Sequence, residues 1–279
     1  MEFTKMQGAG NDFIIINNIK EKIPHEKLSD VAMRLCSRRV SVGADGLMAV
    51  ERAENSGDYR MLFFNSDGSA GEMCGNGARC ICRYGYELGL AGEVQRVETT
   101  AGLVTGRRES ERMYTVRLND PTVIELDRRA SDGEKEIICA YVELGNPGLP
   151  HAVVMYDGVG EASPDVLRRL GALLRHDGAF PKGANVNFCE VTGENSVRVR
   201  TYERGVEDLT LACGTGAGST AAVMTLLGMV SGDNVKIEMD GGELYVTLTA
   251  RGDTVRDIYL TGPTNIVARG EVCDEDMCL

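Results

Sequence analysis

The sequence lacks tryptophan and has only three histidines among its 279 residues. Its nine cysteines form no Cys-x-x-Cys pair, the spacing that zinc sites commonly use, so we expect no metal site. Basic residues are also in the minority, because 30 Lys and Arg stand against 42 Asp and Glu, a net charge of −12. Nucleic acid needs a stripe of Lys and Arg to neutralise its phosphates, and the sequence has no such stripe, which argues against a nucleic-acid partner.

Long apolar runs are missing as well. No segment approaches the roughly 18 consecutive apolar residues of a membrane span, and the first residues, 1–5, lack the regions of a signal peptide. We therefore expect a cytoplasmic protein without a membrane partner. Thiols stay reduced in the cytosol, which agrees with an odd number of cysteines and no disulfide framework.

Glycine, by contrast, is abundant, at 34 residues or about 12% of the chain. The glycines have no period of three, so they indicate tight turns or close backbone approaches instead of a collagen-like repeat. Short β-branched or alternating runs predict strands over 13–16, 59–64, 115–118, 196–202 and 243–248. Helical patterns cover 26–35, 75–88, 163–174 and 214–229. This mixture predicts an α+β fold that is rich in antiparallel strands.

An internal repeat is the most informative feature. Residues 73–78 read Met-Cys-Gly-Asn-Gly-Ala, and residues 212–217 read Ala-Cys-Gly-Thr-Gly-Ala. Cys74 and Cys213 lie half a chain length apart, and each follows a strand and a polar loop and precedes a helix. A third likeness pairs the segments 10–13 and 184–188. The repeat predicts two duplicated domains that face each other.

Each repeat places a thiol at the start of a helix. The first backbone N–H groups there lack intrahelical partners and the helix dipole is positive, which favours a thiolate. The N–H groups of Gly75, Asn76, Gly214 and Thr215 are candidates to bind a carboxylate.

Two facing thiols fit the inversion of a carbon α to a carboxylate. One thiolate would remove the α-proton from one face, and the other thiol would return a proton to the opposite face. The two sets of N–H donors would stabilise the charge that develops on the carboxylate.

At this point the sequence resembles the diaminopimelate epimerase family. The resemblance runs from Phe3 to Gly270 and includes five motifs in the family's order. These are Met6-Gln7-Gly8-Ala9-Gly10-Asn11-Asp12-Phe13, Phe64-Asn65-Ser66-Asp67-Gly68-Ser69, Met73-Cys74-Gly75-Asn76-Gly77-Ala78-Arg79, Tyr202-Glu203-Arg204-Gly205 and Ala212-Cys213-Gly214-Thr215-Gly216-Ala217.

The resemblance implies two pseudo-symmetric domains, each a β-barrel-like sheet wrapped around a central helix. We place them at 1–118, with the segment 264–279 returning to this domain, and at 119–263. It further implies a cofactor-independent isomerase, acting as a homodimer, that interconverts LL- and meso-diaminopimelate for lysine and peptidoglycan synthesis.

Carried over by position, the resemblance makes Cys74 and Cys213 the catalytic base and acid. The turns that follow them would hold the reacting carboxylate. Five further residues match positions that bind the amino and carboxylate groups of the substrate: Asn11, Asn65, Asn185, Glu203 and Arg204. Arg204 suits a carboxylate and Glu203 an ammonium group.

One motif departs from the family. Relatives often have Gly-Asn-Pro-His, whereas residues 145–151 read Gly-Asn-Pro-Gly-Leu-Pro-His. Either three residues are inserted and Asn146 still reaches the substrate beside His151, or Leu149 replaces the asparagine of the aligned copy. Ala268 also stands where some relatives carry an aromatic residue that helps to form the dimer.

Three alternatives stay open. The chain could be a racemase of another amino acid, such as histidine or proline, on the same scaffold. It could be a non-catalytic module that binds an amino-acid carboxylate, although such a module would need neither cysteine. A nucleotide site is disfavoured, because the glycine runs lack the full dinucleotide and phosphate-loop patterns.

The other seven cysteines are expected to be inert: Cys36, Cys80, Cys82, Cys139, Cys189, Cys273 and Cys278.

Overall fold

The computed structural model describes the chain except for residues 72–73, 132, 274 and 276–279. The chain divides into two compact units, one of Met1–Val116 with Gly262–Leu279 and one of Arg117–Thr261. We call them the first and the second unit. Part of the predicted inert set, Cys278, lies outside the described residues.

The first unit is a curved sheet around a helix. Its strands are β1 (Glu2–Gly8), β2 (Asn11–Asn17), β3 (Gly46–Glu51), β4 (Tyr59–Asn65), β5 (Ala70–Gly71), β6 (Val94–Thr99), β7 (Gly102–Arg108), β8 (Met113–Arg117) and β18 (Asn265–Glu271). Its helices are α1 (Asn18–Glu21), α2 (His25–Cys36) and α3 (Gly75–Glu87). The strands pair in the order β18–β1–β2–β3–β4–β6–β7–β8, and only β2–β3 and β4–β6 are parallel.

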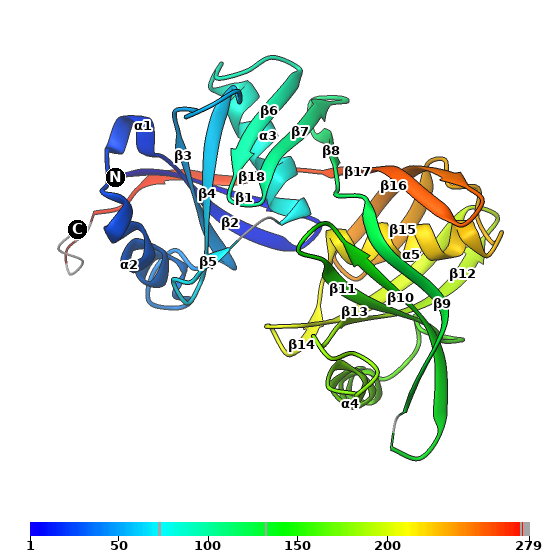
Figure 1. Cartoon of the computed structure of the whole chain (residues 1–279). Helices are drawn as coiled ribbons and strands as arrows, with labels where there is room; N and C mark the ends of the chain where they lie inside the picture. The colour runs from blue at the N-terminus through cyan, green and yellow to red at the C-terminus, as the bar shows by residue number, and fades with distance from the viewer. Residues whose placement is uncertain (72–73, 132, 274, 276–279) are drawn as a thin grey trace. The chain divides into compact units, whose positions relative to one another are not determined.

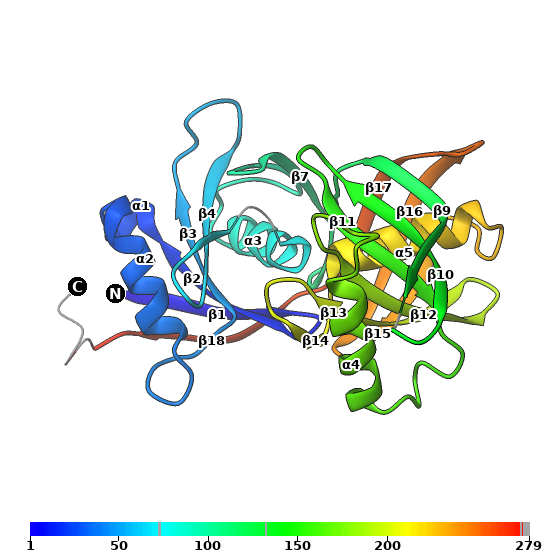
Figure 2. The same cartoon turned by 60° about the horizontal axis from the view of Figure 1, so that its bottom comes forward.

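Helix α3 contacts β1, β2 and β7, which belong to distant parts of this strand order, so the sheet wraps around it (Figure 2). Every residue of α3 from Gly75 to Gly85 is buried. Helix α2 covers the opposite face, where Leu28 and Val31 pack against Ile14 and Leu47.

The second unit repeats this plan. Its strands are β9 (Pro121–Ser131), β10 (Glu136–Leu144), β11 (Leu149–Met155), β12 (Asn185–Gly193), β13 (Ser196–Glu203), β14 (Asp208–Thr210), β15 (Val235–Met239), β16 (Gly242–Arg251) and β17 (Thr254–Pro263). Its helices are α4 (Pro164–Arg175) and α5 (Gly214–Leu226). The strand order is β9–β10–β11–β12–β13–β15–β16–β17, with β11–β12 and β13–β15 parallel. Figure 1 shows α5 among these strands.

The two strand orders therefore match strand for strand, and α3 matches α5, each with 13 residues. The predicted α+β class, with an antiparallel-rich sheet around a central helix in each of two units, is confirmed. The strands and helices expected from the sequence are all present, although the last helix ends at Leu226 instead of Met229.

The third likeness, between segments 10–13 and 184–188, does not mark equivalent positions of the two units, so this prediction is wrong. Asn11 begins β2, whereas Asn185 begins β12, which is the counterpart of β3. The parallel pairing of β2 with β3 begins with Phe13 opposite Gly46, and the equivalent pairing of β11 with β12 begins with His151 opposite Asn185. This register makes Leu149 the counterpart of Asn11, so two similar asparagine segments had suggested a correspondence that the strands do not have.

Candidate active site

Cys74 ends the loop before α3, and its backbone is extended at φ −117° and ψ 121°. Its carbonyl accepts from the N–H of Ala78 at 2.7 Å, so the helix begins directly after the cysteine. The thiol is partly exposed, while Gly75 and Asn76 in the first turn are buried. The helix N-terminus predicted for this thiol is therefore present.

Cys213 occupies the same place in the second unit, with φ −123° and ψ 110°. The N–H of Gly216 donates to its Sγ at 3.4 Å, and the Thr215 hydroxyl lies 3.5 Å from the same sulfur. Cys213 is buried, with 6% of its surface exposed. Such donors and the positive end of the helix favour the thiolate form of a cysteine.

Three predicted asparagines of the first unit gather at one edge of its sheet. Asn76 donates a hydrogen bond from Nδ2 to Oδ1 of Asn11, and Asn11 donates in turn to Asp45 at 3.3 Å. Asn65 lies opposite Gly46 at the end of β4, and its side chain donates to the Ser69 hydroxyl at 2.9 Å. The edge also holds the backbone link from the Ser66 N–H to Asp45. The Asn76–Asn11 hydrogen bond thus joins the first turn of α3 to this sheet edge.

A charged cluster supports this edge. Arg38 pairs with Asp12 at 2.6 Å and with Asp45 at 2.9 Å, and Lys5 pairs with Asp12 at 2.9 Å. Burial opposes the ionisation of Asp12, but the hydrogen bonds from Arg38 and Lys5 hold its pKa below the ordinary value. The cluster fixes the loop that presents Asn11.

In the second unit, Asn185 and Arg204 are in direct contact. Oδ1 of Asn185 accepts from the backbone N–H of Arg204 at 2.8 Å, and the Arg204 guanidinium donates to the carbonyl of Lys182 at 3.1 Å. Glu203 ends β13 and accepts from the Thr210 hydroxyl at 2.8 Å. The charged side chains of Glu203 and Arg204 are partly exposed, as a binding role requires.

His151 lies in β11 and is completely buried. Its Nδ1 is 3.2 Å from Nδ2 of Asn187, while its Nε2 is buried without a partner in the described residues. Burial, with the nearby charge of Arg204, lowers the pKa of His151 to about 3, so the ring is neutral at physiological pH. Substrate contact by His151 stays a prediction.

The altered motif falls in the turn between β10 and β11. Asn146 is exposed there and joins Pro147 through a cis peptide bond. Leu149 begins β11 two residues before His151, in the position that Asn11 has in β2. This register favours the second interpretation of the motif, in which a leucine replaces an asparagine, and substrate contact by Asn146 stays a prediction.

Sequence reasoning missed two buried polar residues next to the helix turns. Asn187 in β12 accepts from the Thr201 hydroxyl at 2.9 Å and donates to the carbonyl of Ala152 at 3.0 Å. A Cβ on Gly216 would lie 2.3 Å from Oδ1 of Asn187, so this amide supports the first turn of α5. Arg79 lies inside α3. The Asn-x-Asn spacing and the arginine after Gly-Asn-Gly-Ala were visible in the sequence, but their burial was not.

The cysteines predicted to be inert that the structure describes are buried, apart from the exposed Cys273. Burial raises the pKa of Cys36, Cys80, Cys82 and Cys189 to about 12 and that of Cys139 to about 11, so these thiols stay protonated at neutral pH. Among the described residues, no group of His, Cys, Asp and Glu suits a metal ion. No helix within the same residues is long and apolar enough to cross a membrane.

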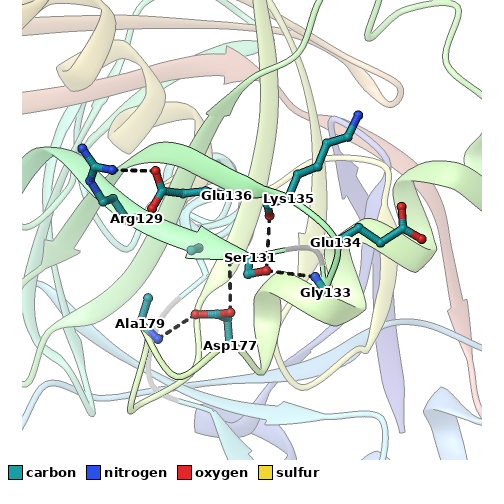
Figure 3. A pocket seen from close by; sticks show the side chains of 9 residues that line it. Arg129, Ser131, Gly133, Glu134, Lys135, Glu136, Asp177 and Ala179 are labelled. Carbon is teal, nitrogen blue, oxygen red and sulfur yellow. Dashed lines mark hydrogen bonds and ion pairs between the residues drawn. The ribbon is translucent and has the colours of Figure 1, made fainter.

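A surface pocket of about 470 Å³ lies at the tip of the β9–β10 hairpin (Figure 3). Arg129 and Glu136 pair across it, and Asp177 accepts from the N–H groups of Ser131 and Ala179. The pocket is at the opposite end of β10 from Leu144, which pairs with Leu149. It contains none of the candidate residues.

Solved structures define the class of fold. The chain superposes with a TM-score of 0.74 and 16% identity on a probable proline racemase from Agrobacterium radiobacter, covering 99% of this chain and 94% of the other. A hydroxyproline epimerase from Agrobacterium vitis gives 0.72 and 20%, with 99% and 94% covered. The chain thus has the two-unit fold of the proline-racemase-like proteins.

Sequence comparisons then give the family. The sequence model of diaminopimelate epimerase matches residues 3–123 and 144–267. The chain is 39% identical to the diaminopimelate epimerase of Aquifex aeolicus, over 99% of both chains, and 38% identical to that of Methanocella arvoryzae, over 98% and 96%. The chain belongs to the diaminopimelate epimerase family, and the resemblance and the isomerase class expected from the sequence are confirmed.

Proposed function

We propose that this protein inverts the α-carbon at one end of diaminopimelate, between the LL and meso forms, by proton transfer between Cys74 and Cys213. The observation that carries the proposal is the duplication: two units of one strand order each place a cysteine directly before a buried 13-residue helix. No cofactor is needed, because the thiolate takes the α-proton and the second thiol supplies one to the other face of the carbon.

The carboxylate next to that carbon would be held by the first N–H groups of α3 and α5. Those of Gly75 and Asn76, and of Gly214 and Thr215, come before the first intrahelical hydrogen bonds of their helices. As the proton leaves, negative charge develops on the carboxylate, and fixed donors stabilise it most at that moment.

The remaining groups would bind the other charges of the substrate. The partly exposed Arg204 guanidinium suits the distal carboxylate, and the Glu203 carboxylate suits an ammonium group. Asn11, Asn65 and Asn185 supply amides that can accept from ammonium or donate to carboxylate. A substrate with amino-acid chemistry at both ends uses all of these residues.

The setting of the reaction is part of the proposal. The product would serve the synthesis of lysine and of peptidoglycan precursors in the cytoplasm, where cysteines remain reduced. Diaminopimelate carries two ammonium and two carboxylate groups, so it has no net charge that the net charge of −12 of the protein would repel. A homodimer is also proposed, from the family resemblance alone.

A second candidate is a racemase of another amino acid, such as histidine, on the same scaffold. Leu149 favours it, because an apolar side chain stands where the first unit has Asn11. A site that lacks one amide binds a doubly zwitterionic substrate less well. The family match favours diaminopimelate over this alternative.

The test is α-hydrogen exchange in deuterated water. LL- and meso-diaminopimelate are compared with L-histidine, L-lysine, L-glutamate and L-proline. We expect exchange at one end of both diaminopimelate isomers and much less with the others. Exchange with histidine alone would replace the substrate and keep the two-thiol mechanism, whereas no exchange with any amino acid would contradict the proposal.

A further inference from the structure

Arg79 is the largest fully buried side chain in the described chain, with 0% of its surface exposed. It lies in α3, five residues after Cys74, in the helix that the sheet of the first unit encloses. A guanidinium is always charged at neutral pH, and burying a charge without a partner of opposite sign costs several kcal/mol. Its burial therefore needs an explanation.

The contacts of Arg79 all point to the first turn of its own helix. Its guanidinium donates to Oδ1 of Asn76 at 2.8 Å and, with a long bond of 3.4 Å, to the carbonyl of Gly75. The hydrogen-bond chain continues from Asn76 to Asn11, because Nδ2 of Asn76 donates to Oδ1 of Asn11. Arg79 thus fixes the side chain of one predicted carboxylate-binding residue and, through it, that of another.

Arg79 has no carboxylate partner among the residues that the structure describes. No Asp or Glu among the described residues forms an ion pair with it, and its Nε is buried without a hydrogen-bond partner. Burial lowers the pKa of Arg79 to about 10, and the groups that oppose this effect are the thiols of Cys80, Cys74 and Cys82. Cys80 and Cys82 stay protonated, because burial raises the pKa of each to about 12. Within the described part of the chain, the remaining candidate for an anion near Arg79 is the Cys74 thiolate.

We infer that Arg79 is a positioning residue that holds Asn76 in place and whose buried positive charge stabilises the thiolate of Cys74. Only the kinetic part of this inference rests on the proposed function. The thiolate part concerns the charge balance of the first unit and holds for any reaction at Cys74.

In the described residues, the strands that pack against α3 offer no unpaired charge that could compete. On β1 and β2, Lys5 pairs with Asp12 at 2.9 Å, and Glu2 pairs with Lys20. On β7, Arg107 and Arg108 pair with glutamates at 2.7 and 3.4 Å. These strands pack against α3, but their charged groups are already compensated.

The same helix supplies a matched control. Arg83 lies one turn after Arg79 and is also buried, with 8% of its surface exposed. It pairs with Glu87 at 2.9 Å and donates to the carbonyl of Thr264 at 2.8 Å. Its charge is compensated at the far side from Cys74, so Arg83→Gln removes a buried arginine without removing the proposed thiolate partner.

At the position of this cation the second unit has a glycine. The residue that corresponds to Arg79, counted from the cysteine, is Gly218, and a Cβ there would lie 2.7 Å from Leu118. The Cys213 sulfur instead accepts from the N–H of Gly216. Cys213 therefore serves as an internal reference for any effect of Arg79.

The experiment measures iodoacetamide alkylation of the full chain against pH, with Cys74 and Cys213 followed separately by peptide mass spectrometry. In Arg79→Gln we expect the Cys74 midpoint to rise by about one pH unit or more, since a close opposite charge shifts a pKa by roughly 1–3 units. The Cys213 midpoint should stay in place, and Arg83→Gln should move neither. An unchanged Cys74 midpoint in folded Arg79→Gln, or an equal shift in Arg83→Gln, would overturn the inference.

Arg79→Lys keeps the test open if Arg79→Gln does not fold. Lysine retains the charge but loses the planar fork that binds Asn76. We expect the Cys74 midpoint to stay within about half a unit and kcat/KM for diaminopimelate to fall at least about tenfold. A kcat/KM equal to that of the unmodified chain would contradict the positioning role. Alkylation is independent of turnover, so the thiolate result stands even if the proposed function fails.

Discussion

The two units share a backbone plan but surround their cysteines with different side chains. His151 stands where the first unit has Phe13, and Asn187 stands where it has Met48. In the central helices, Gly218 of the second unit stands where the first unit has Arg79. The first unit joins its helix turn to a sheet edge through the Asn76–Asn11 contact, and the second joins it through Asn187. Both units thus place a cysteine directly before a helix, whereas the side chains next to these two helix N-termini differ.

The strongest way to break this comparison is to remove either thiol. Cys74→Ser and Cys213→Ser should each lower α-hydrogen exchange by about 10³-fold or more, because a serine hydroxyl is a far weaker base than a thiolate. The measurement is deuterium incorporation into diaminopimelate. Exposed Cys273→Ser is the control and should keep full activity. Full exchange in both single variants would show that the two units do not act as a base and acid pair.

Oxidation tests whether the two thiols meet. If one substrate carbon lies between them, mild oxidation should join Cys74 and Cys213 in a disulfide, abolish nearly all activity, and be reversed by a thiol reductant. Peptide mass spectrometry after graded oxidation gives the link, with buried Cys139 and Cys189 expected to remain free. Loss of activity without a Cys74–Cys213 peptide would count against a shared site.

The equivalent glycines Gly77 and Gly216 sharpen the difference between the helix turns. A Cβ on Gly77 would meet the flexible end of Met48 at 2.1 Å, whereas one on Gly216 would meet the hydrogen-bonded amide of Asn187 at 2.3 Å. The Met48 side chain can rotate away, but the Asn187 amide would have to give up hydrogen bonds. Gly216→Ala should therefore lower the free energy of unfolding by about 1–3 kcal/mol. Gly77→Ala should cost less than about 1.5 kcal/mol.

Urea unfolding of the two variants gives these values, and activity gives a second readout. Gly216→Ala should also reduce exchange activity more than Gly77→Ala, because the N–H of Gly216 donates to the Cys213 sulfur. Equal losses in the two variants would mean that Asn187 yields as readily as Met48.

Much of this comparison followed from the sequence. Periodicity predicted the strands and helices, and the Cys-Gly-x-Gly-Ala repeat predicted the two helix N-termini, because both signals are local. The end of α5 was misplaced by three residues, although Gly228, with φ +69°, stops the helix through a backbone conformation that favours glycine.

The failures came from long-range pairing. The likeness of Asn11 to Asn185 was wrong because strand register depends on which strands pair, and two short asparagine motifs do not determine that. The burial of Arg79 and Asn187 also escaped prediction. An arginine in an amphipathic helix usually faces solvent, and only the sheet that encloses α3 removes it from water.

His151→Phe gives the second unit the residue that the first unit has at Phe13. Burial lowers the pKa of His151 in the folded chain to about 3, below the ordinary histidine value of 6.5, so the unfolded chain binds the proton more readily. The stability contributed by the neutral ring is present above pH 6.5 and is lost progressively as pH falls toward 3. The variant should remove this pH dependence of the free energy of unfolding, which is at most about 1.4 kcal/mol per pH unit.

Urea unfolding at pH 7 and pH 5 measures the effect, and the unmodified chain should lose about 1–2 kcal/mol more than the variant over this interval. His25 is the control, since it is largely exposed and pairs with Glu51. His25→Phe should keep the slope that His151 causes. Identical pH dependence of His151→Phe and the unmodified chain would mean that the buried ring is not the source.

The smallest expected effect concerns Leu149, the counterpart of Asn11. If the missing amide weakens binding of the distal end of diaminopimelate, Leu149→Asn should raise kcat/KM by about tenfold, the equivalent of one hydrogen bond to a charged group. The gain should appear in KM more than in kcat, because this contact lies away from the reacting carbon in the proposed site. Leu149→Ala separates the amide from the loss of bulk and should give no gain. If Leu149→Asn lowers activity toward diaminopimelate and Leu149→Ala does not, the leucine itself contacts the substrate, and the two units recognise its ends by different chemistry.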